Sequence, residues 1–141
     1  MVNNLHMSLL KSIGAVAAGF LVVALLSAAT DFVLEKSSIF PSTSEHGLFV
    51  TWMLVLAFAY RSVYAVLGGY VTAILSPNNP SRHVMVLGIL GTLGGIAGVV
   101  AGWNLSQHWY PIALAVTAYP LVWFGGWINN SKKREFSSAQ Q

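Results

Sequence analysis

The sequence predicts an all-α membrane protein whose four transmembrane helices form an antiparallel up-down bundle with cytoplasmic N and C termini. Of its 141 residues, 55% are hydrophobic and only 8% are charged, whereas about a quarter of the residues in a soluble domain are charged. Four apolar runs are each long enough to cross a bilayer, which takes roughly 20 helical residues. Turn-forming segments separate the runs and leave no room for a soluble catalytic domain.

The first run covers about residues 9–34, with Lys11 near its start and Asp31 near its end. Its front half, up to Ser27, is similar in pattern to a secretory signal. We expect the run to be a retained span, because its apolar character continues through Leu34. A stripe of mostly small residues, spaced by three and four, places Asp31 on a protein-facing side. The stripe consists of Gly14, Ala17, Leu21, Ala24, Ala28, Asp31 and Glu35.

The second run, about residues 48–75, ends at a Ser-Pro-Asn-Asn-Pro segment. Proline cannot continue a helix and asparagine tolerates turn geometry, so this segment predicts a turn. The third and fourth runs cover about 84–105 and 109–128, and their short connection predicts a hairpin. Residues 1–131 are therefore expected to form a single domain, followed by a basic cytoplasmic tail, 132–141, that is disordered beyond Phe136.

Basic residues predict the orientation of the bundle, because lysine and arginine favour the cytoplasmic side of short loops. With the N terminus inside, only Lys36 lies outside. The cytoplasmic set is Lys11, Arg82, Lys132, Lys133 and Arg134.

Glycines in the third run repeat at spacings of three and four. Membrane helices associate by close backbone approach over small residues, so this seam predicts that the third span is the central helix or an oligomer interface. The seam consists of Gly88, Gly91, Gly95, Gly98 and Gly102.

Arg61 lies near the middle of the second run, on a face with Ala57, Ala65 and Gly68. A charge at that depth costs from about 2.5 to more than about 10 kcal/mol, so it needs a partner, a cavity or a ligand. Asp31 is the expected partner. Side chains lean toward the N terminus of their own helix, so on antiparallel spans the two residues reach toward each other.

Several roles are open for this pair. It could be a structural ion pair that fixes helix register, or a site for an anionic or polar solute with Tyr60, Tyr64 and Tyr119 as walls. Asp31 could also be a proton- or ion-coupled carboxylate, and Arg61 could extend to the interface without a partner.

Pro120 lies in the middle of the fourth run and removes the usual donor to the carbonyl of Val116. We expect a kink there, which serves either packing or a functional cavity. Thr117 and Tyr119 would line that cavity or satisfy the freed carbonyl.

Other function classes have little support in the sequence. The chain has no cysteine, which removes thiolate chemistry, and its scattered basic residues make no nucleic-acid groove. Acidic and imidazole side chains gather on the expected outer side without tight metal-ligand spacing: Asp31, Glu35, Glu45, His46 and His108. We expect no enzyme activity, no cofactor and no metal site.

A resemblance can be stated for the last three runs. The segment Tyr60–Ala73, Trp103-Asn104 and the segment His108–Leu114 resemble a group of small bacterial four-span membrane proteins without an assigned function. The resemblance implies a bacterial inner-membrane location and no particular activity.

Two functions follow as expectations. The chain is an accessory or structural component of the bilayer that packs into an oligomer or a larger membrane complex. Alternatively, it transports or binds a small solute of unknown identity at Arg61 and Asp31.

Overall fold

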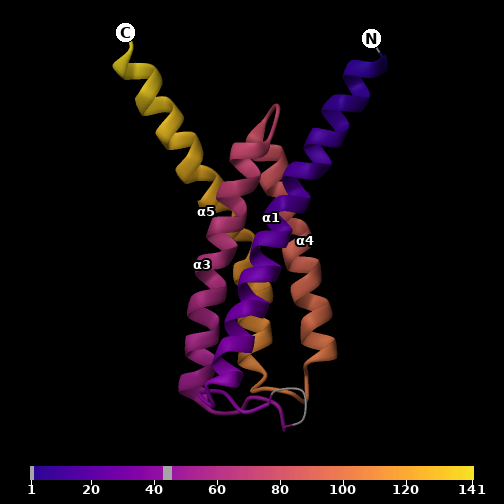
Figure 1. Ribbon diagram of the computed structural model, residues 1–141, viewed down its shortest axis with the longest axis vertical. Coiled ribbons are helices and arrows are strands. Elements are labelled where there is room, and N and C mark those ends of the chain that lie inside the picture. The colour runs from indigo at the N-terminus through magenta and orange to yellow at the C-terminus, as the bar shows by residue number, and fades with distance from the viewer. Residues whose placement is uncertain (1, 43–45) are drawn as a thin grey trace.

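Four long helices form the protein in the computed structural model, which describes residues 2–42 and 46–141. They are α1 (Val2–Lys36), α3 (Thr51–Leu75), α4 (Pro80–Ala101) and α5 (Trp109–Ala139). All four are long and apolar enough to cross a membrane, which makes the chain a multi-pass membrane protein. Figure 1 shows both termini and the α3–α4 turn at one end, called here the terminal end, and the connections that follow α1 and α4 at the other, the loop end.

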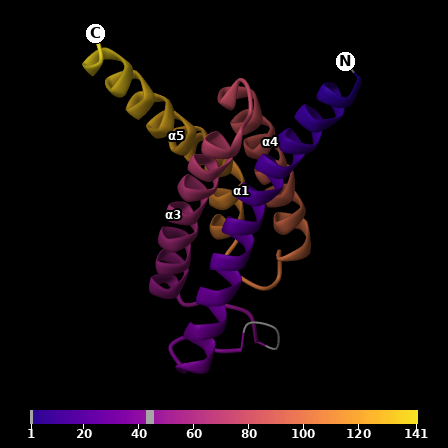
Figure 2. The ribbon, with the colours of Figure 1, turned by 45° about the horizontal axis from the view of Figure 1, so that its top comes forward.

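The helix boundaries differ from the expected spans at several places. α1 begins at Val2 rather than near residue 9, and α5 continues to Ala139, so the expected disorder beyond Phe136 is wrong. These extensions splay away from the bundle (Figures 1 and 2). The α5 extension carries Lys132, Lys133, Arg134 and Glu135, which favour helix without requiring burial. Lys132 also packs over the Tyr70 ring, 5.4 Å from its centroid.

α4 lies about four residues earlier than the third apolar run suggests. It begins at Pro80, because proline fits the first helical turn, where no N–H is needed, and Asn79 precedes it in the left-handed conformation (φ 48°). The helix ends at Ala101, where the N–H of Gly102 donates to the carbonyl of Gly98. The segment after Gly102 then joins the loop end instead of extending the span.

The loop end is tied together across the sequence. The Leu48 N–H donates to the Leu105 carbonyl at 2.7 Å, and Gln107 Nε2 donates to the Phe49 carbonyl at 2.7 Å. Gly47 has φ +69°, and a Cβ there would lie 2.6 Å from the Leu105 oxygen. Only glycine fits this approach without strain.

The helices follow one another around the bundle in the order α1, α3, α5, α4. α3 packs along both α1 and α5, and α4 packs along α5. The closest crossings use glycine: Gly19 of α1 lies against Gly68 of α3, and Gly125 of α5 lies against the backbone of Val66 on α3. Of the two roles expected for the third span, that of the central helix is wrong, because α4 packs mainly along α5. Its role as an oligomer interface stays a prediction.

α1 buries a different face from the one that its small-residue stripe suggests. Ala15, Gly19 and Ser27 are buried, whereas a Cβ added at Gly14 would meet nothing within 4 Å. The buried face is offset by one residue from the small-residue stripe, because Gly19 lets the Gly68 backbone approach more closely than the larger Leu21 would. Asp31 lies at the edge of this face.

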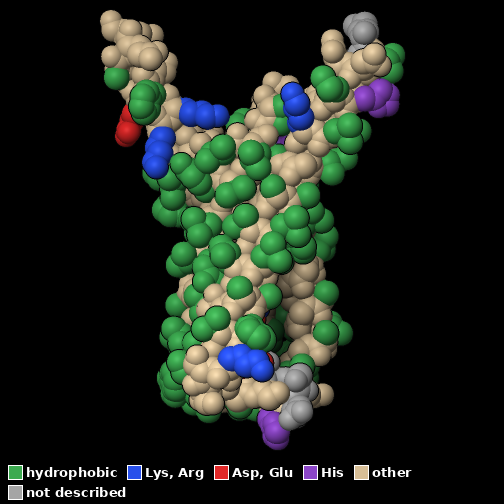
Figure 3. Space-filling model, viewed as in Figure 1, with side chains coloured by type: hydrophobic (Ala, Val, Ile, Leu, Met, Phe, Trp, Pro, Cys, Tyr) green, Lys and Arg blue, Asp and Glu red, His purple; other side chains and the backbone are tan. Residues whose placement is uncertain are grey.

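Two small apolar clusters hold the ends of the bundle. Phe40, Leu48, Leu54 and Ala57 pack near the loop end. Ala73, Val84, Leu87 and Val122 pack toward the terminal end. Most large hydrophobic side chains instead face outward (Figure 3), as expected where lipid is the solvent. The space between the two clusters is hollow.

Candidate functional site

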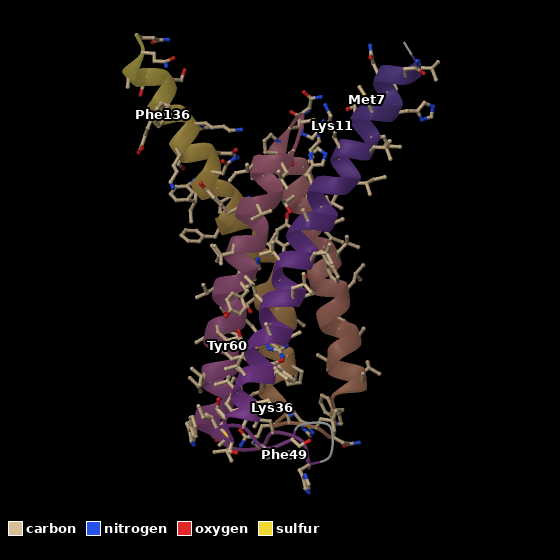
Figure 4. The ribbon with its side chains drawn as sticks, viewed as in Figure 1. Met7, Lys11, Lys36, Phe49, Tyr60 and Phe136 are labelled. Carbon is tan, nitrogen blue, oxygen red and sulfur yellow. The ribbon has the colours of Figure 1, made fainter. Side chains whose placement is uncertain are left out.

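Asp31 and Arg61 form an ion pair between α1 and α3, as the sequence predicts. Arg61 Nη2 donates to Asp31 Oδ2 at 2.5 Å. The side chains of Asp31 and Arg61 are 31% and 34% exposed, so the pair lies inside the bundle without being sealed from it. Figure 4 shows Tyr60, the neighbour of Arg61, in the half of the bundle nearer the loop end, which Lys36 and Phe49 mark.

Tyr60 completes the surroundings of the carboxylate. Its hydroxyl donates to Asp31 Oδ1, so each oxygen of Asp31 accepts one hydrogen bond from α3. The Tyr60 ring also lies 5.8 Å from that of Tyr64. Asp31 is thus satisfied by two donors from consecutive residues of the neighbouring helix.

Arg61 has unused donor capacity. A guanidinium carries five N–H groups, and the Nε of Arg61 is buried without a hydrogen-bond partner among residues 2–42 and 46–141. A buried donor without an acceptor costs about 1–3 kcal/mol. The Nε is thus sealed within the protein, whereas the rest of the Arg61 side chain is partly exposed and can meet an acceptor that enters the bundle.

The small face of α3 explains why the pair can form. Ala57, Gly68 and Thr72 are buried on the Arg61 face, and the Thr72 hydroxyl donates to the Ala15 carbonyl of α1 at 3.2 Å. Close approach at Gly19 and Gly68 sets the spacing of the two helices. Asp31, about three helical turns further along α1, then reaches the level of Arg61.

A cavity of about 850 Å³ adjoins the pair and is walled by all four helices. Its volume falls in the range of small-molecule sites. Near the loop end its wall includes Asp31, Glu35, Tyr60, Arg61 and Tyr110. Farther from the loop end the wall is apolar, with Phe20, Val23, Leu87, Leu121 and Val122.

Three residues expected around the site lie elsewhere. Tyr64 does not line the cavity; its hydroxyl is 2.7 Å from Thr30 Oγ1, and this hydrogen bond links α1 and α3. Tyr119 packs on Gly88, in the α4–α5 contact. Pro120 lies inside α5 and is exposed on its outer side, so it is not part of the cavity wall. A mid-helix position alone does not decide which way a side chain points.

The glycine seam of α4 divides into two halves. Gly88, Gly91 and Gly95 face α5, where a Cβ on Gly95 would lie 2.7 Å from the Ala115 Cα. A Cβ on Gly98 would meet nothing within 4 Å, and Gly98 and Gly102 line the cavity. Gly91 and Gly95 line the cavity as well, so the seam is a helix contact from Gly88 to Gly95 and a cavity wall from Gly91 to Gly102.

Tyr110 belongs to the site although the sequence did not predict it there. It lies with Leu114, Thr117 and Leu121 on one stripe of α5, at helical spacing, and all four line the cavity. The sequence contains this periodicity, but the expected kink at Pro120 favoured another face of the helix as the site. Thr117 lines the cavity, as one alternative expected, and its hydroxyl donates to the Ala113 carbonyl.

Among the described residues, no group of three or more histidine, aspartate or glutamate side chains is placed to hold a metal ion. Glu45, one of the acidic residues expected on this side, lies outside the described residues. His108 stacks on Trp103, with ring centroids 3.9 Å apart. The polar end of the cavity is a hydrogen-bonding and charged surface because Asp31, Arg61 and Tyr110 line it.

Comparisons of the chain with known protein families, with curated proteins and with solved structures found no match.

Proposed function

We propose that this chain is a membrane-embedded binding protein or transporter for a small molecule, which occupies the cavity and contacts Arg61. The role is binding rather than catalysis. One observation carries the proposal: four helices wall a cavity of about 850 Å³ beside a charged pair whose side chains are partly exposed. A structural ion pair alone would be expected to lie in packed surroundings.

We further propose that the protein resides in a bacterial inner membrane with both termini in the cytoplasm. The resemblance of the Tyr60–Ala73 segment supports the location. Most Lys and Arg side chains visible in Figure 3 lie toward the terminal end, where Figure 4 labels Lys11, whereas Lys36 lies near the loop end. This distribution supports the orientation. The polar end of the cavity then faces the outer half of the bilayer.

A second candidate function is that of an accessory component packed against another membrane chain. The open half of the glycine seam supports it, because Gly94 and Gly98 are exposed with nothing within 4 Å of an added Cβ. Such small positions admit a partner helix. The partner would be a second copy of this chain or a larger complex.

Native mass spectrometry of the protein, released from nanodiscs, tests both functions at once. Gly98→Leu places a side chain in the cavity, whereas Gly14→Leu adds the same side chain to an open site away from it. We expect the native chain and Gly14→Leu to retain a bound nonprotein mass. Gly98→Leu should lose that mass and remain folded by circular dichroism.

The same spectra separate the alternatives. A dimer or heteromer that carries no small molecule and dissociates in Gly98→Leu would favour the accessory role. A bound mass that is equally present in Gly98→Leu would contradict the cavity as the site.

A further inference from the structure

The cavity has the polarity of an amphipath. Its polar groups gather near the loop end, around Arg61 and Tyr110, and its remaining length is largely apolar. The hydroxyls of Ser62 and Thr117 along the wall donate to carbonyls of their own helices. They therefore have little demand for a ligand, and the polar end alone would recognise a head group.

The cavity opens sideways, between α1 and α4. These helices meet near Gly19 and Leu87, but they make little contact elsewhere. Figure 3 shows the molecule hollowed between them toward the loop end. Small exposed residues form both edges of this opening and also line the cavity: Ala24, Ala28, Gly94 and Gly98. A molecule dissolved in the bilayer can enter here without crossing water.

The head group should accept hydrogen bonds. Both oxygens of Asp31 already accept, from Tyr60 and Arg61. The Arg61 guanidinium lines the cavity, and a guanidinium carries only donors. An acceptor such as a carbonyl oxygen complements it.

The head group should also be uncharged. Asp31 neutralises Arg61 at 2.5 Å, and Glu35, the other carboxylate in the described wall, has an interaction of its own. The cavity therefore presents no surplus positive charge to an anion. A charged head would in addition lose its solvation on entering an apolar site, which costs several kcal/mol unless it is paired.

We propose that the occupant is an uncharged amphipath with a carbonyl-type acceptor head. This inference rests on the proposed function. The occupant enters from the bilayer between α1 and α4, places its head at Arg61 and lays its apolar body against the wall formed by Phe20 and Leu121.

Photolabelling in phosphatidylcholine nanodiscs tests this. The probes are methyl undecyl ketone, dodecanoate and dodecylammonium, each with the same diazirine in its tail, so that only the head differs. We expect the ketone to label the peptides that contain Ala24–Ala28 and Gly94–Gly98 about tenfold more efficiently than either charged probe, a difference of about 1.4 kcal/mol. Arg61→Lys keeps the charge but replaces the planar fork of N–H donors with a single ammonium group, and should reduce ketone labelling toward the level of the charged probes.

The controls separate the two proposals. Gly98→Leu should abolish labelling by all probes, and Gly14→Leu should leave it unchanged. Stronger labelling by dodecanoate or dodecylammonium, or equal labelling by all three, overturns the inference about the head but leaves the cavity as a binding site. If no probe labels the cavity, or if Gly98→Leu labels like the native chain, the proposed function itself fails. Even if Arg61→Lys does not fold, the relative labelling of the native chain by the three probes decides the inference about the head group.

Discussion

The Asp31 carboxylate joins two helices through charge and hydrogen bonding together. Tyr60 and Arg61 each donate to one of its oxygens, so it is held from a single face of α3. Both charges are about one third exposed to the cavity, which lowers their desolvation cost relative to a sealed pair. The same exposure leaves the guanidinium accessible to a ligand.

Removing Arg61 should destabilise the protein more than removing both charges. Arg61→Met leaves Asp31 without its counter-ion, and we expect a loss of about 1–3 kcal/mol, less than the roughly 3–5 kcal/mol of a fully buried pair. Adding Asp31→Asn should recover part of this loss. Reversible unfolding in dodecyl sulfate gives the coupling energy from the double-mutant cycle.

An exposed pair on the C-terminal extension of α5 is the control for this cycle. Lys133→Gln and Glu135→Gln, both exposed, should be additive. Additivity of the Asp31 and Arg61 substitutions as well would show that the ion pair does not contribute to stability.

α4 uses one glycine repeat for two purposes along its length. At Gly95 the backbone of α5 is so close that a Cβ would lie 2.7 Å from the Ala115 Cα. One turn later, at Gly98, the neighbouring space belongs to the cavity. The two helices are thus held tightly in the first half of the repeat and leave room for a ligand in the second.

Alanine substitutions along this repeat should therefore have opposite effects. Gly95→Ala forces backbone apart and should cost about 1–3 kcal/mol, as overpacking does. Gly98→Ala meets no neighbour and should leave stability unchanged or raise it by up to about 1 kcal/mol, because alanine favours helix over glycine. The midpoints of thermal unfolding in one detergent measure both. Equal destabilisation at the two positions would mean that Gly98 packs against something in the membrane, such as a partner chain.

The whole bundle is asymmetric in how tightly it closes. α1, α3, α5 and α4 pack in sequence, but the contact between α4 and α1 is slight. The opening lies on the side of the molecule rather than at its loop end, and small residues edge it. This arrangement suits a ligand that arrives through lipid, with the polar end of the cavity near one bilayer surface.

The orientation in the membrane can be read by cysteine labelling, because the chain has no cysteine of its own. We expect a membrane-impermeant maleimide to label Asn104→Cys from the outside of spheroplasts. Ser138→Cys should react only after permeabilisation if the terminal end is cytoplasmic, as the placement of the basic residues predicts. The reverse pattern would place the polar end of the cavity toward the cytoplasm.

Composition and charge placement were enough to predict four spans and the pairing of Asp31 with Arg61. Apolar runs of this length have few alternatives in a bilayer, and a deep arginine needs a counter-charge. The sequence did not reveal which face of α1 is buried or that Tyr119 and Pro120 lie away from the site. In an apolar helix nearly every face is compatible with lipid, so hydrophobic periodicity does not distinguish inward from outward positions.

The sequence by itself thus determined the solvent of this protein, its number of helices and the two charges that meet inside it, because bilayer thickness and the cost of an isolated charge are local constraints. Only the tertiary structure decided that the space beside those charges is a cavity open between α1 and α4. Its existence depends on how closely backbones approach at Gly19, Gly68 and Gly95 and on where they diverge at Gly98. That geometry arises from pairs of helices, which no single apolar run encodes.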